Sequence, residues 1–387
     1  MKIPMIKTTI IVLFLMIAGL TNAWCQQTRC YIFNGEPFPD IVFQSILSKQ
    51  NQKYLGISDS HRAMKGFTDF YSFALADTEA ELIIIELINI HCFTCQTQAP
   101  IMNAIYNLID LDHNLKTKVK MLAICPGNTF QEVEKFKKQY SVPFPVIPDP
   151  QFEIYEVIGN QCSTPFILMA RKNKQEHIIT WSHIGRIADP LYFMQKVWDS
   201  LNIDIQQIVE KTKEKAEVKV ISKKLKPYIS DEKIKHKILA SLERQRLNLL
   251  DLKKISLSNN QDIFVGKAKQ ENKITHFFTK LISQNPVCDL CHSIHFILMF
   301  DENGIILDFI PIHITKHENV LLNLSENIKL RKRLTGKSIL KPLNFDPRVD
   351  AISQATMSSA LIFYSVGKTR AYYEELEQKG YINKQNQ

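Results

Sequence analysis

Two cysteines separated by two residues, Cys92 and Cys95, stand between an apolar run and an amphipathic segment. The run 82–90 predicts a buried strand and the segment 101–109 predicts a helix, so the cysteines fall at a helix start. The partial positive charge and free N–H groups of a helix N-terminus stabilise a thiolate there. At this spacing the second thiol can also resolve a mixed disulfide made by the first. The motif therefore predicts a thiol–disulfide redox site.

Strands and helices alternate along 24–201, which predicts a three-layer α/β domain. A second buried strand is expected at 118–124. A capping box at Thr129 predicts that the next helix starts there. A later strand is entered through Thr164-Pro165, and the domain closes with a hairpin and a helix at 190–201.

Three further features accompany the cysteine pair: Pro100 follows Cys95 by five residues, Glu86 precedes Cys92 by six, and Thr164-Pro165 opens a strand. With these features the region of about 30 to 200 resembles the thioredoxin superfamily. Within it, the region is most similar to the exported thiol–disulfide reductase and redoxin (peroxiredoxin-like) branch. The resemblance implies a thioredoxin-like α/β/α fold that requires no cofactor. It also implies substrates that are protein thiols or disulfides, or a small disulfide.

The resemblance also implies a role for each matching residue. Cys92 would be the exposed attacking thiol and Cys95 the resolving thiol. Glu86, if buried, would have a raised pKa and could accept the proton of Cys95 as a general base. Pro165, if its bond to Thr164 is cis, would lie against the pair and help to hold a substrate in an extended pose.

Two departures from the family pattern refine this prediction. His91 replaces the usual tryptophan before the first cysteine, so its imidazole would either tune the pKa of Cys92 or simply face solvent. The peroxiredoxin branch needs a threonine three residues before its peroxidatic cysteine and a proline further upstream. Asn89 and Ile85 occupy those places, which argues against peroxidase activity.

The N-terminus predicts export. Lys2 and Lys7 precede a short apolar run at 10–20, and the small residue Ala23 follows it, so 1–23 is typical of a signal peptide. An uncleaved membrane anchor is the alternative. In either case the chain would act outside the cytoplasm, in the periplasm or cell envelope, where disulfides persist. The pairing of the remaining cysteines stays open: Cys25, Cys30, Cys125 and Cys162.

The formal net charge of +9 does not indicate a nucleic-acid partner, because the lysines are spread along the chain without interleaved aromatic residues. A lysine- and glutamate-rich stretch at 202–230 predicts an exposed helix or linker. A smaller α+β domain is expected over 231–387. It would contain helices at 231–252 and 274–282, and strands at 293–300 and 305–310 around a turn.

A second C-x-x-C pair, Cys288 and Cys291, lies in this domain and is followed by His292. The five residues match a haem c attachment sequence. The strand-like run that follows argues against an enclosing haem pocket, so we favour a second redox-active or structural disulfide. We expect no metal site, because no second ligand pair is evident.

Near the C-terminus, Asp350, Ser353, Ala355 and Thr356 have the spacing of a flavin-attachment signature. This part resembles the FMN-binding domains of Rnf-type and sodium-pumping electron-transfer complexes, although Gln354 departs from the small residue expected. The resemblance implies FMN esterified to Thr356, Asp350 as a recruiter of the flavin transferase, and a membrane electron-transfer partner. The alternative is an ordinary serine or threonine cap of the last helix.

These observations lead to one main hypothesis and two alternatives. The main hypothesis is an exported thiol–disulfide oxidoreductase that relays electrons between Cys92/Cys95 and Cys288/Cys291. The first alternative is a non-catalytic binding or assembly protein whose cysteine pairs are structural. The second is a haem or flavin electron-transfer fusion.

Overall fold

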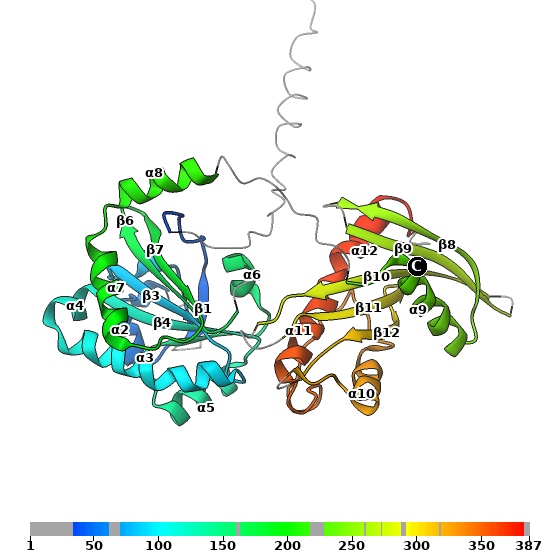
Figure 1. Cartoon of the computed structure of the whole chain (residues 1–387), viewed down its shortest axis with the longest axis horizontal. Coiled ribbons are helices and arrows are strands. Elements are labelled where there is room, and N and C mark those ends of the chain that lie inside the picture. Colours follow the sequence, from blue (N-terminus) through cyan, green and yellow to red (C-terminus); the bar gives the residue numbers. More distant parts are fainter. Residues whose placement is uncertain are drawn as a thin grey trace, which may run out of the picture.

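The computed structural model describes residues 34–61, 70–159, 163–216, 228–258, 261–271, 273–287, 292–316 and 319–382. These residues form a first domain (34–216) and a second domain (228–382), drawn at left and right in Figure 1. The predicted signal segment 1–23 and five of the cysteines lie outside the described residues: Cys25, Cys30, Cys162, Cys288 and Cys291. Within the described ranges no helix combines the length and the apolar character needed to cross a membrane.

A five-stranded mixed sheet, in the order β5-β4-β3-β6-β7, is the centre of the first domain. Its strands are β3 (Leu82–Leu87), β4 (Val119–Pro126), β5 (Val146–Asp149), β6 (Phe166–Asn173) and β7 (Glu176–Ile184). The apolar strand expected before the cysteine pair is β3, and all six of its residues are buried. A strand buried on both faces needs a layer on each side of the sheet.

One layer consists of α3 (Phe93–Leu111), α4 (His113–Lys118), α5 (Phe130–Tyr140) and α7 (Pro190–Asn202). The other contains the antiparallel pair β1 (Phe43–Ile46) and β2 (Phe70–Phe73), with α2 (Lys49–Leu55) and α6 (Glu153–Gly159). Short 3₁₀ turns lie at Asp59–His61 and Leu75–Asp77. The predicted three-layer α/β domain is confirmed, with the antiparallel pair β1 and β2 contributing to the third layer.

The strand directions bring three loops to one edge of this sheet. β3 and β4 are parallel, so the loops that follow them, which carry Cys92 and Thr129, leave at the same edge. β6 is antiparallel to β3, and Phe166 pairs with Leu87, so the residues before β6 lie at that edge too. Thr164-Pro165 is therefore brought to the cysteine pair by the topology.

The charged stretch 202–230 begins with a helix, α8 (Ile205–Ala216), which Figure 1 shows beside β7 of the first domain. The Thr212 hydroxyl donates a hydrogen bond to the Asn34 carbonyl oxygen at 2.6 Å. For 202–230 the sequence predicted either an exposed helix or a linker, and its first half forms a helix.

The second domain is built on an antiparallel sheet of sequential strands, in the order β12-β11-β10-β9-β8. The strands are β8 (Asn248–Leu257), β9 (Gln261–Gln270), β10 (Lys273–Gln284), β11 (Ile294–Asp301) and β12 (Ile306–His313). Helix α9 (Asp231–Arg244) covers one face. Helices α10 (Leu324–Leu334), α11 (Thr356–Gly367) and α12 (Thr369–Gln378) cover the other. This is the expected α+β domain.

Two predicted helices of this domain were wrong in part or in whole. The helix expected at 274–282 is strand β10, whose residues Phe277 and Phe278 are both buried, against opposite layers. A strand covered on both faces has no polar–apolar alternation, so its apolar spacing imitates that of a helix. The helix expected at 231–252 ends at Arg244, and its last leucines belong to β8.

The two domains are in contact along α6 and α11, which face each other across the middle of Figure 1. The rings of Phe152 and Tyr364 have their centroids 4.8 Å apart. Next to them Glu156 and Lys368 form an ion pair. One apolar cluster runs through both domains without interruption. The carboxyl edge of the first sheet is therefore close to the second domain.

Candidate active site

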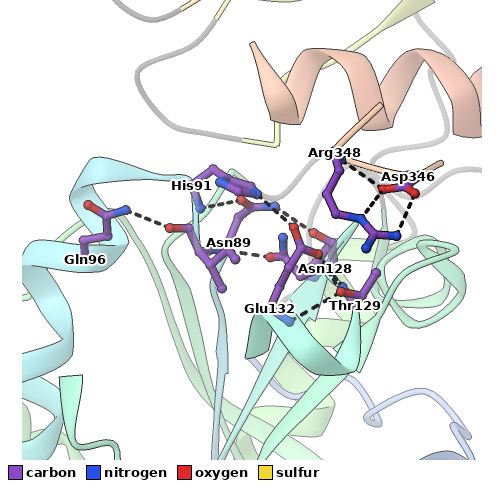
Figure 2. A network of polar contacts seen from close by, with 10 residues as sticks. Asn89, His91, Gln96, Asn128, Thr129, Glu132, Asp346 and Arg348 are labelled. Carbon is purple, nitrogen blue, oxygen red and sulfur yellow. Dashed lines mark hydrogen bonds and ion pairs between the residues drawn. The ribbon is translucent and has the colours of Figure 1, made fainter. Parts of the chain in front are cut away.

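The loop from β3 to α3 is held by side chains that bond to backbone atoms. Asn89 accepts a hydrogen bond from the His91 backbone N–H at 3.0 Å and donates one to the Pro126 carbonyl at 2.8 Å. The Asn128 side chain accepts from the Ile90 N–H at 3.1 Å, and Figure 2 shows these residues around His91. Asn89, which occupies the place of the peroxiredoxin threonine, thus fixes this loop.

The loop places Cys92 as the N-cap residue of α3, with Cys95 in its first turn. Both are thiols and are not joined by a disulfide. The sulfur of Cys92 donates to the Thr164 carbonyl oxygen at 3.6 Å. Burial and the neighbouring Cys92 sulfur raise the pKa of Cys95 well above its ordinary value. Cys95 is therefore a protonated thiol that needs a proton acceptor before it can attack.

The predicted exposure of Cys92 was wrong, since only 1% of the residue is accessible. Cys92 belongs to an apolar cluster of the first domain, and Met357 of the second domain packs against that cluster. A local sequence pattern could not show this packing, because Met357 lies 265 positions after Cys92 in the chain.

Glu86 lies on β3 and is buried, as expected. Burial raises its pKa to about 7, although a hydrogen bond from Gln98 opposes that shift. The Gln98 side chain donates to the Glu86 carboxylate at 2.6 Å and accepts from the Ile187 N–H at 2.8 Å. A carboxyl group with a pKa near neutrality can both take and return a proton at physiological pH.

Gln98 was not predicted as a site residue. It is fully buried on α3, three residues after Cys95, so it lies on the same helix face as that thiol. The available signal was a polar residue on the inner face of a helix that is otherwise apolar there. A buried amide must find hydrogen-bond partners, and its partners here are Glu86 and Ile187.

Thr164 and Pro165 are joined by a cis peptide bond, and both lie beside the cysteine pair as expected. The Thr164 carbonyl contacts the Cys92 sulfur. The Thr164 backbone N–H donates a hydrogen bond of 2.5 Å to the carbonyl of Val287 in the second domain. Val287 is the last described residue before Cys288 and Cys291, which lie outside the described part of the chain.

The His91 imidazole is hydrogen-bonded to a carboxylate, with 3.3 Å between its Nε2 atom and Oε1 of Glu132. Glu132 also accepts hydrogen bonds from the N–H and hydroxyl of Thr129, which completes the predicted capping box (Figure 2). Burial raises the pKa of Glu132, but the bonds from His91 and Thr129 outweigh it and lower the pKa below its ordinary value. The imidazole is thus held at the start of the cysteine loop.

A cavity of about 710 Å³ opens between the domains beside this loop. The lining residues come from the loop before Cys92, the start of α5 and the segment that precedes α11: His91, 129–132, 345–348 and Thr356. Arg348 in this lining is already paired with Asp346, as Figure 2 shows. The cavity wall therefore contains one carboxylate from each domain, Glu132 and Asp346. The one arginine among the lining residues, Arg348, already has an acidic partner.

The residues predicted to bind flavin are spread over different environments. Thr356 begins α11 and lines the cavity, whereas Ser353 is exposed. Asp350 is buried and accepts bonds from the Arg333 side chain and the Asp346 N–H. Two carboxylates, Glu132 and Asp346, lie near Thr356 in the cavity wall, which does not suit a phosphate dianion. These residues do not form a flavin phosphate cradle, and FMN attachment stays a prediction.

Of Cys288, Cys291 and His292, the structure describes only His292, which is exposed. Its ring centroid lies 6.0 Å from that of His313. No group of metal-binding side chains is present among the described residues.

Comparisons with known proteins concern the first domain. No protein-family model matches the chain. It is similar to the thiol-disulfide oxidoreductase ResA of Geobacillus thermodenitrificans (strain NG80-2), with 23% identity over 177 residues, which are 45% of this chain and 85% of that protein.

Two solved structures illustrate the structural similarity. StoA from Bacillus subtilis is 17% identical, with a TM-score of 0.26, and the match covers 33% of this chain and 88% of that one. The thioredoxin domain of a thiol-disulfide oxidoreductase from Bacteroides vulgatus is 14% identical, with a TM-score of 0.30, and the match covers 43% of this chain and 99% of that one. The strand order of the first domain is that of a thioredoxin-like α/β fold, and the ResA relative is named as a thiol-disulfide oxidoreductase.

Proposed function

We propose that this protein is an exported thiol–disulfide oxidoreductase whose reacting groups are Cys92 and Cys95. The observation that carries the proposal is the position of the two thiols at the start of α3, with Thr164-Pro165 on one side. Glu86, buried and bonded to Gln98 one turn beyond Cys95, supplies a proton acceptor of suitable pKa. Protein thiols and disulfides are the proposed substrates, as the name of the ResA relative suggests.

The proposed reaction has two exchange steps. The Cys92 thiolate attacks one sulfur of a substrate disulfide, so that a mixed disulfide forms and one substrate thiolate leaves. Cys95 then gives its proton to Glu86 and attacks the Cys92 sulfur. The Cys92–Cys95 disulfide forms, the second substrate thiolate leaves, and two electrons have passed to the substrate. Run in reverse, the same steps oxidise a substrate dithiol.

The reduction potential of the Cys92/Cys95 pair tests this proposal against a structural role. The purified chain is equilibrated in glutathione and dithiothreitol buffers, and its thiols are trapped and mapped by mass spectrometry. We expect a potential between about −270 and −120 mV, the range of catalytic pairs. A potential below about −300 mV, with no trapping of Cys92, would support the non-catalytic assembly class instead. Cys125, a buried thiol outside the pair, serves as the unreactive control.

We also propose that the pair exchanges electrons with Cys288 and Cys291. The support is that Val287, which precedes Cys288 in the chain, is hydrogen-bonded to Thr164 beside Cys92. In the exchange, a dithiol in one pair reduces the disulfide of the other, so electrons and protons balance within the chain. A Cys288→Ser/Cys291→Ser variant should shift the redox state of Cys92/Cys95 and change turnover. If both remain as in the wild type, there is no relay.

A further inference from the structure

The backbone of Thr164 offers two groups next to the reactive sulfur. Its carbonyl oxygen lies 3.6 Å from the Cys92 sulfur, and its N–H is bonded to Val287 of the second domain. A polypeptide whose disulfide meets Cys92 must pass along this backbone edge. Free backbone groups at a strand entrance bind extended chains by main-chain hydrogen bonds. Here the edge is already occupied by the protein's own second domain.

The attacking sulfur is also closed to large molecules. A disulfide bond of about 2 Å can form only when the two sulfurs come into direct contact. Cys92, at 1% exposure, allows no such contact with a disulfide held in another protein. Met357, which packs on the cluster around Cys92, belongs to the second domain. With Val287 bonded to the Thr164 N–H, this places the second domain at the edge that a polypeptide substrate would use.

One face of α11 contributes several of the contacts between the second domain and the first. Met357 and Tyr364 are seven residues apart on α11, so they project from the same side of that helix. Tyr364 packs on Phe152, and Lys368 at the end of α11 pairs with Glu156. An aromatic pair and a half-exposed ion pair are modest interactions. The apolar cluster that continues from one domain into the other adds to these contacts, so the docked arrangement is the resting one and undocking must expose apolar surface.

We propose that the second domain occupies the polypeptide-binding edge of the Cys92 site and that protein substrates react only when it undocks. This inference rests on the proposed function, since it concerns access to the same thiol. The occupant is the chain's own second domain, held by Val287 at Thr164 and by α11 at α6.

Alkylation of Cys92 in the chemically reduced full chain tests the proposal without requiring disulfide exchange. Rates are measured with a small reagent, iodoacetamide, and with a maleimide that carries a long polyethylene glycol chain. The modified peptide is identified by mass spectrometry. Two variants loosen the contact from opposite sides: Tyr364→Ala/Lys368→Ala in the second domain and Glu156→Arg in the first. The control is Tyr372→Ala/Arg370→Ala, which likewise removes a tyrosine and a cationic residue, but from α12. Their partners there, Lys280 and Glu374, both belong to the second domain.

We expect both loosening variants to react with the bulky maleimide about tenfold faster than the wild type, with the control unchanged. Equal rates in the wild type and both loosening variants would overturn the proposal, as would wild-type Cys92 that reacts as fast as in the denatured chain. Circular dichroism shows whether each variant is folded. If the double variant fails to fold, the alkylation rate of Glu156→Arg, a surface change, tests the proposal alone. The two proposals can fail separately. If the variants change the alkylation rate but the reduction potential of Cys92/Cys95 lies below about −300 mV, the proposed function is wrong while the docking of the second domain is supported.

Discussion

Replacing Cys92 by serine should abolish formation of mixed disulfides, whereas replacing Cys95 by serine should make them accumulate. Cys92 is the N-cap residue of α3, where an anion is favoured, and Cys95 is buried and protonated. Loss of the attacking sulfur should lower the exchange rate by at least about three orders of magnitude, the scale on which enzymes lose activity with their nucleophile. Loss of Cys95 leaves the first step intact but removes the sulfur that releases the substrate.

The two variants are compared by incubation with a disulfide-bonded peptide and mass spectrometry under non-reducing conditions. Cys95→Ser should show a stable adduct on Cys92, and Cys92→Ser should show none. Cys125→Ser is the matched control, because this thiol is buried on β4 outside the pair and should leave both steps unchanged. An adduct that accumulates in Cys92→Ser would mean that the roles of the two thiols are reversed.

Replacing Glu86 by glutamine should stabilise the protein at alkaline pH and leave it unchanged in acid. Glu86 has a pKa of about 7 when folded, against an ordinary value of 4.5, because burial disfavours its charge. Between these pH values the folded state holds a proton that the unfolded state has released. Stability therefore falls as the pH rises from about 4.5 through about 7. The total loss is on the order of 3 kcal/mol, and Glu86→Gln should not show it.

Urea unfolding at a series of pH values measures this effect as the difference between the variant and the wild type. Asp149, with a pKa raised to about 6 by burial, and His177, with a pKa lowered to about 4 by burial, titrate in both proteins and cancel in that difference. We expect no difference near pH 4 and a more stable variant at pH 8. Parallel pH profiles would show that Glu86 is not the source of the slope.

The same variant should slow the second exchange step. Without a carboxylate, Cys95 has no strong proton acceptor, so release of the second substrate thiol should be about 10²- to 10⁴-fold slower. Formation of the mixed disulfide by Cys92 should change little. Asp149→Asn is the control, since it alters another buried carboxyl group without touching the pair. Equal slowing of both steps in Glu86→Gln would indicate a general structural defect.

Features that depend on near neighbours in the chain were predictable. The buried strand before the cysteines, the helix start at Cys92 and the capping box at Thr129 all follow from residues within a few positions of one another. The burial of Glu86 was a condition taken from the family resemblance, and it is met in the structure. The cis bond at Pro165 came from the family resemblance and is present in the structure.

Other features depend on which layers cover a segment. Strand β10 looked like a helix because its neighbours in the fold bury both of its faces. The hydrogen bond from Gln98 to Glu86 joins α3 to β3, and no local pattern identifies such a partner. Thr164 and Val287 are linked across the domain contact for the same reason.

The sequence by itself determined the chemistry of this protein: two thiols at a helix start, a carboxyl group on the preceding strand and a proline turn. These depend on residue type and short spacing. The tertiary structure alone decided how accessible that chemistry is: Cys92 is buried, and Val287 of the second domain accepts a hydrogen bond from the Thr164 N–H beside it. Burial is a property of the whole packed chain, since the atoms that exclude water from a thiol can come from any distance along it.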